Sequence, residues 1–70
     1  MERLAVDSSA LRSVGYDAAR RVLELEFTGG SVYRYDAVPG RVHRELMAAD
    51  SHGRYFARRI RGRYAYRRVR

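Results

Sequence analysis

The last 18 residues of the chain, GRYFARRIRGRYAYRRVR, concentrate the side chains that could bind a ligand. Eight of these residues are arginines, three are tyrosines, and none is acidic. An arginine guanidinium can bind a phosphate through two parallel hydrogen bonds, and a tyrosine ring can stack on a nucleobase. The composition therefore favours contact with nucleic acid, with a solvated basic surface as the simpler alternative.

The net charge is distributed just as unevenly. Residues 1–50 carry seven arginines and eight acids, for a charge of −1, whereas residues 51–70 carry eight arginines and no acid, for a charge of +8. The whole excess of +7 thus comes from the last third of the chain. Such a concentrated positive field attracts polyanions, so the expected partner is nucleic acid or an acidic protein surface.

Groups for catalysis or metal binding are scarce. A serine nucleophile requires a base within hydrogen-bond reach, and the two histidines, His43 and His52, form no recognisable motif with Ser8, Ser9 or Ser51. There is no cysteine, and two histidines without a matching pattern of acids do not suggest a metal site. We therefore predict a protein that is not an enzyme and that needs no cofactor, metal or small-molecule substrate.

A chain of 70 residues holds one domain with a thin hydrophobic core, so a second subunit could add stability. No apolar run approaches the roughly 20 residues that cross a bilayer, and the N-terminus lacks the basic and apolar regions of a signal peptide. We expect a single cytoplasmic domain over residues 1–70, with no membrane partner.

The elements that position the arginines and tyrosines follow from the periodicity. Residues 21–27, RVLELEF, alternate between apolar and polar side chains, which predicts a strand. The turn sequence TGGS and a second extended run complete a hairpin. With two further extended segments, the predicted strands are 11–16, 21–27, 31–36 and 64–69.

Helical periodicity begins at Pro39, where the apolar residues of segment 39–50 fall on one stripe. Ser51 is a good N-cap for a second helix that runs to about Arg61, and Gly62 is typical of a residue that ends a helix. The pattern predicts an α+β fold: a small antiparallel sheet of three to four strands with two helices packed on one face.

These elements group the candidate binding residues. Arginines at helical spacing share the polar face of the second predicted helix, and arginines of the final strand can extend that patch. Tyr33 and Tyr35 project from one face of their strand because side chains alternate, so they either stack on bases or pack beneath the helices; Tyr66 carries the same two alternatives. The candidate nucleic-acid-binding residues are Arg54, Arg58, Arg61, Arg63, Arg67, Tyr33, Tyr35 and Tyr66.

Arg59 differs from its neighbours. On a helical wheel it falls between Tyr55 and Phe56, toward the buried side. We expect it to stack on a ring or to pair with a carboxylate such as Asp17 or Asp36, which is a structural role.

Six short motifs together span nearly the whole chain. They are Ser8-Ser9, Gly15-Tyr16-Asp17, Leu25 to Phe27, Tyr33-Arg34-Tyr35, Val38-Pro39 and Ser51 to Tyr64. In this order the motifs resemble those of the KTSC domain family. The resemblance implies a domain of this length that occurs alone in bacteria and at the C-terminus of some lysyl-tRNA synthetases, an association that suggests RNA.

Two functions remain open at this point. The first is non-catalytic nucleic-acid binding through the arginine-rich helix face and the final strand, with RNA favoured over DNA because of the synthetase association. The second is protein interaction, as a homodimer or as a docking domain for an acidic partner. An exposed apolar patch or an unpaired edge strand would indicate the second function.

Overall fold

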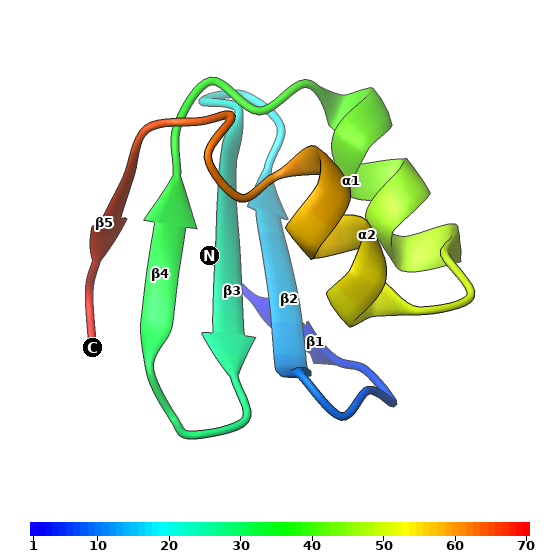
Figure 1. Cartoon of the computed structure of the whole chain (residues 1–70). Coiled ribbons are helices and arrows are strands. Elements are labelled where there is room, and N and C mark those ends of the chain that lie inside the picture. The colour runs from blue at the N-terminus through cyan, green and yellow to red at the C-terminus, as the bar shows by residue number, and fades with distance from the viewer.

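A five-stranded antiparallel sheet and two helices make up the fold, and the computed structural model describes all 70 residues. The strands lie side by side in chain order, and the chain forms both helices after β4 before it returns to the edge of the sheet as β5 (Figure 1). Neither helix is long and apolar enough to cross a membrane. The elements are β1 (Arg3–Ala5), β2 (Leu11–Asp17), β3 (Val22–Phe27), β4 (Val32–Tyr35), α1 (Gly40–Ala48), α2 (His52–Arg59) and β5 (Tyr66–Arg68).

The core lies between the helices and one face of the sheet. Alternation along β3 directs Leu23 and Leu25 to that face, where neither is exposed to solvent. Both helices bury one apolar stripe against these strands, which is the burial that stabilises short helices in small domains. The core cluster is Leu11, Val14, Leu23, Leu25, Tyr35, Val38, Val42, Leu46, Phe56 and Ile60.

Local signals explain where α2 begins and ends. The Ser51 hydroxyl accepts a hydrogen bond from the Arg54 backbone N–H at 3.2 Å, which caps the helix as predicted. After Ile60 the chain turns through Gly62, whose φ of +75° is a conformation that glycine adopts at little cost. This turn directs the following residues back toward β4.

The opposite face of the sheet, called the open face here, carries no helix and is held together by charge. Glu24 in the central strand is only 3% exposed, and its two oxygens accept hydrogen bonds from Arg3 on β1 and from Arg34 on β4. Arg3 also donates to the Ser13 hydroxyl at 2.9 Å. One buried carboxylate thereby ties β1, β3 and β4 together.

The prediction of an α+β fold with an antiparallel sheet and two helices is confirmed, but the sheet has five strands rather than three to four. The additional strand, β1, is three residues long and has no distinctive alternation. It pairs closely with β2 because Gly15 has no side chain: a Cβ there would lie 2.9 Å from the Arg3 Cγ and 2.9 Å from the Glu2 carbonyl oxygen. The final strand is shorter than the predicted 64–69, although Val69 and Arg70 still donate backbone hydrogen bonds to Val32.

Removing the Glu24 carboxylate should destabilise the fold, because it leaves Arg3 and Arg34 facing each other without a counter-charge. We expect Glu24→Ala to lower the free energy of unfolding by about 3 kcal/mol in urea denaturation followed by circular dichroism. Arg70→Ala, which breaks an exposed pair with Glu26, is the control and should cost less than about 1 kcal/mol. Equal losses of unfolding free energy in the two variants would show that Glu24 does not hold the three strands together.

The same carboxylate gives the fold a defined acid sensitivity. Burial alone would raise the pKa of Glu24, but the hydrogen bonds from Arg34 and Arg3 outweigh burial and hold the pKa below its ordinary value of 4.5. A lowered folded-state pKa contributes stability that is present above 4.5 and is lost as the pH falls through the folded-state value. The difference in urea midpoint between the wild type and Glu24→Gln should therefore shrink between neutral pH and strongly acidic pH. A constant difference would contradict this assignment.

Candidate nucleic-acid interface

Five aromatic rings form a closed circle at the edge of the core. Each ring contacts two others, with centroids 5.3 to 5.8 Å apart, and the neighbouring pairs are tilted or edge-on rather than parallel. They come from the β3–β4 hairpin and from α2 and β5, which follow it later in the sequence. In order around the circle they are Phe27, Tyr33, Tyr66, Tyr35 and Phe56.

Strand register brings these rings together. Tyr33 and Tyr35 share the helix-facing side of β4 with Leu25 and Leu23, which are their cross-strand partners on β3. On the other side, β5 pairs so that Tyr66 lies directly opposite Tyr35. The rings therefore continue the apolar face of the sheet beyond the area covered by the helices.

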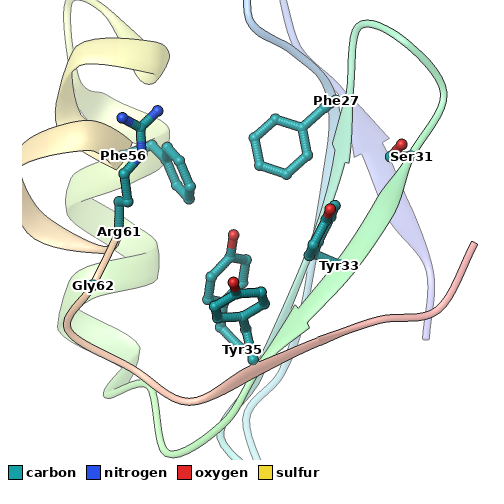
Figure 2. A pocket seen from close by; sticks show the side chains of 8 residues that line it. Phe27, Ser31, Tyr33, Tyr35, Phe56, Arg61 and Gly62 are labelled. Carbon is teal, nitrogen blue, oxygen red and sulfur yellow. The ribbon is translucent and has the colours of Figure 1, made fainter.

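The circle surrounds a cleft of about 450 Å³, called the aromatic cleft here. Figure 2 shows Phe27 and Tyr33 on its strand side, Phe56 on its helix side and Arg61 beside Phe56. The Arg61 Cζ lies 5.5 Å from the centroid of the Phe56 ring, a cation–π contact. Tyr66 is 62% exposed and forms the outer wall, whereas Tyr35 is 5% exposed and forms the floor.

The cleft tyrosines keep their hydroxyls free. Tyr16 donates to the Val38 carbonyl at 2.6 Å and Tyr55 to a Glu45 carboxylate oxygen at 2.7 Å, but Tyr33, Tyr35 and Tyr66 donate to no group of the protein. Burial, reinforced by the neighbouring tyrosines, raises the pKa of Tyr35 to about 12. Its hydroxyl therefore remains a hydrogen-bond donor at neutral pH.

Arginines of α2 and of the turn that follows it make up the second feature. All of them are exposed, and none forms an ion pair with a carboxylate. Three of them line a separate hollow of about 310 Å³ at the start of the helix, together with Asp50 and Ser51. This group, called the α2 arginines here, comprises Arg54, Arg58, Arg59, Arg61 and Arg63.

The arginines at the end of the chain lie on both faces of the sheet. Arg68 is opposite Tyr33 in the β4–β5 register, so it lies on the side of the aromatic cleft, and it has no carboxylate partner. Arg67 is opposite Arg34 in the β4–β5 register, so it belongs to the open face and not to the side of the aromatic cleft. It pairs with Asp36 at 3.6 Å, and Arg70 pairs with Glu26 at 3.4 Å. The predicted patch is therefore divided: the α2 arginines are unpaired, while Arg67 and Arg70 are partly neutralised by sheet acids.

The family model described as the KTSC domain matches residues 7–64, which is most of the chain. The chain belongs to the KTSC domain family. The family description names a domain and no catalytic activity.

Two relatives match this KTSC domain along most of both chains. The crystal structure of a KTSC domain protein from Yersinia pestis superposes with a TM-score of 0.94 and is 40% identical in sequence. The alignment covers 99% of this chain and 97% of that chain. A protein of Stutzerimonas stutzeri is 54% identical over 56 residues, which are 80% of this chain and 79% of that protein.

The KTSC domain also matches part of larger enzymes. The lysine–tRNA ligase of Trichormus variabilis is 36% identical over 66 residues, which are 94% of this chain but only 12% of the ligase. The ligase of Nostoc sp. matches to the same extent.

Three residues depart from what the sequence suggests. Arg59 is exposed, pairs with neither Asp17 nor Asp36, and is not the arginine that stacks on a ring, since that contact is made by Arg61 on Phe56. The expectation of a stacked or paired Arg59 is therefore wrong, and its long side chain carries the charge outward. Phe27 and Phe56 line the cleft although sequence reasoning did not select them. The signal for Phe27 was its place on the same alternating face as Leu25.

The polar groups that could suggest catalysis have structural partners. The Ser8 hydroxyl accepts backbone hydrogen bonds from Ala10 and Leu11, which caps the turn before β2. His43 stacks on Tyr16 with ring centroids 4.7 Å apart, and burial followed by the nearby Arg44 charge lowers the pKa of His43. His52 lies with Nδ1 2.8 Å from the Leu46 carbonyl oxygen. No cluster of three or more His, Cys, Asp or Glu side chains could hold a metal ion.

A buried ring and an exposed ring of the aromatic cleft should differ in their contribution to stability. Phe56 is 7% exposed and contacts two rings of the circle, so Phe56→Ala should cost about 3–5 kcal/mol of unfolding free energy. Tyr66 is mostly exposed, so Tyr66→Ala should cost less than about 1 kcal/mol. Urea denaturation measures both, and a large loss in Tyr66→Ala would mean that this ring belongs to the core.

Proposed function

We propose that this KTSC domain is a non-catalytic nucleic-acid-binding domain that prefers RNA and holds the phosphate backbone with the α2 arginines. The observation that carries the proposal is the density of unpaired charge in one segment. Five exposed arginines without a carboxylate partner lie within residues 54–63, and the chain has no acid after Asp50. Arg3, Arg34, Arg67 and Arg70 pair with carboxylates, and the unpaired strand arginines Arg12 and Arg68 lie outside this segment. Unpaired, exposed guanidinium groups are the ones free to exchange counterions for phosphates.

The position of the α2 arginines supports the same function. Arg54 lies in the first turn of α2, where free backbone N–H groups also favour an anion. Arg61 follows the helix and lines the aromatic cleft, and Arg63 donates back to the Arg58 carbonyl oxygen at 3.1 Å, which keeps its charge beside α2. Because Arg67 shares its charge with Asp36 on the open face, we assign the final strand a smaller part in phosphate binding.

The preference for RNA rests on the relatives. A segment 36% identical to this chain is present in lysine–tRNA ligases, whose name makes tRNA a substrate of the whole enzyme. A domain as basic as this one would be suited to hold tRNA by its phosphate backbone. Contacts to phosphates position a nucleic acid without reading its sequence, so the binding should show little sequence selectivity.

Protein interaction is the second candidate, and one feature favours it. On the edge strand β1, Leu4 is 62% exposed, and the neighbouring Met1 is 50% exposed. An unpaired strand edge with apolar side chains can join a second copy of the chain. Sedimentation equilibrium tests this role: a dimer that Leu4→Arg converts to a monomer would support it, and a monomer at all concentrations would oppose it.

The salt dependence of RNA binding tests the principal proposal. In fluorescence anisotropy with labelled tRNA and single-stranded RNA, log K should fall linearly with log salt concentration. Changing Arg54 and Arg58 to Gln should weaken binding and flatten the slope, by about 0.7 for each single-strand phosphate that the variant no longer neutralises.

A matched control removes two arginines elsewhere. Arg20 and Arg41 are exposed and form no ion pair, so changing both to Gln lowers the net charge equally but leaves α2 intact. This variant should keep most of the slope. If both double variants lose affinity equally, only net charge matters, and if the wild type does not bind RNA at modest salt, the proposed function is wrong.

A further inference from the structure

The aromatic cleft has a role that phosphate binding by the α2 arginines does not require. Resting on the function proposed above, we infer that the aromatic cleft is a subsite for one unpaired nucleobase, whose adjoining phosphate binds Arg61. The domain would then select single-stranded segments or strand ends over continuous duplex.

Size and lining suit such a ligand. A volume of about 450 Å³ lies within the roughly 300–1,000 Å³ of small-ligand pockets. The wall ring, Tyr66, lies on the helix-facing side of the sheet, is 62% exposed, and offers a face for stacking. The other rings are already in mutual contact, so the cleft is formed in advance and a base would enter it at little cost in ordering.

Hydrogen-bonding capacity argues against a purely apolar occupant. The hydroxyls of Tyr33, Tyr35 and Tyr66 donate to no group of the protein, in contrast to those of Tyr16 and Tyr55. An aliphatic side chain or a lipid tail would cover these hydroxyls without replacing the water they bind, which costs free energy. A nucleobase presents both a flat face and donor and acceptor groups along its edge.

Charge argues against a cationic occupant. Aromatic circles can bind ammonium groups by cation–π attraction, but the Arg61 guanidinium already lies over the Phe56 ring. Arg61 has no carboxylate partner, and the chain carries a net charge of +7. The cleft therefore favours a ligand in which a flat ring is joined to an anion, as a base is joined to its phosphate.

Three labelled RNAs isolate the contribution of the base: a blunt hairpin, the same hairpin with a short single-stranded extension, and that extension with one abasic residue. Wild type should bind the extended hairpin about 5- to 100-fold more tightly than the blunt one, the range expected for stacking one base. The abasic residue keeps its phosphate but lacks the base. If the cleft binds the base at that position, the affinity should fall toward that of the blunt hairpin.

Variants place the effect in the aromatic cleft. Tyr66→Ala should bring the extended and blunt hairpins within about twofold of each other. Leu4→Ala removes an equally exposed apolar side chain from the opposite edge of the sheet and should keep the preference. Equal wild-type affinity for the blunt and extended hairpins would overturn the inference while leaving backbone binding intact, and so would a preference that survives Tyr66→Ala.

Free AMP tests whether the aromatic cleft binds a nucleotide that is not part of an RNA chain. In ¹H–¹⁵N correlation spectra, millimolar AMP should shift the amides of Tyr33, Arg61 and Tyr66, and the shifts should vanish in Tyr66→Ala. If no RNA binds but AMP produces these shifts, the proposed RNA function fails and the cleft is a site for free nucleotides. If neither RNA nor AMP binds, both the function and the cleft assignment are wrong.

Discussion

Incomplete cover of the sheet by two short helices is the constraint from which the other features follow. Helices of nine and eight residues are about 12–14 Å long, whereas the outer strands of a five-stranded sheet lie about 19 Å apart. Leu23 and Leu25 are fully covered, but the same face continues as Tyr33 and Tyr66, which are not. Aromatic rings with free hydroxyls tolerate this half-exposed position, and the result is a cleft in place of a closed core.

The charges divide along the same boundary. Four arginines, Arg3, Arg34, Arg67 and Arg70, pair with Glu24, Glu26 or Asp36, and the buried Glu24 also holds β1 in place. After Asp50 the chain has no acid, so α2 and the turn after it carry arginines alone. Paired arginines therefore lie mainly on the face away from the helices, and the densest unpaired charge lies on α2 and the turn after it. This arrangement makes α2, and not the final strand, the centre of the proposed interface.

Features that depend on local pattern were predictable, and features that depend on long-range pairing were not. Period-two alternation predicts the β3–β4 hairpin and the shared face of Tyr33 and Tyr35, and Ser51 and Gly62 mark the ends of α2. The circle of five rings needs Tyr66 opposite Tyr35, a register set only after the chain has passed through both helices. Likewise β1 depends on Arg3 reaching Glu24, which no neighbouring residue indicates.

Amide chemical-shift mapping with a short single-stranded RNA tests the central claim most directly, because it reports every backbone amide at once. The proposed interface predicts that the largest shifts fall within residues 51–63 and at Tyr33 and Tyr66, and that they diminish as salt is raised. The open face around Glu24 and Arg34 should change little. Shifts concentrated on the open face or along β1, or no shifts at all, would contradict the claim that the α2 arginines and the aromatic cleft bind RNA.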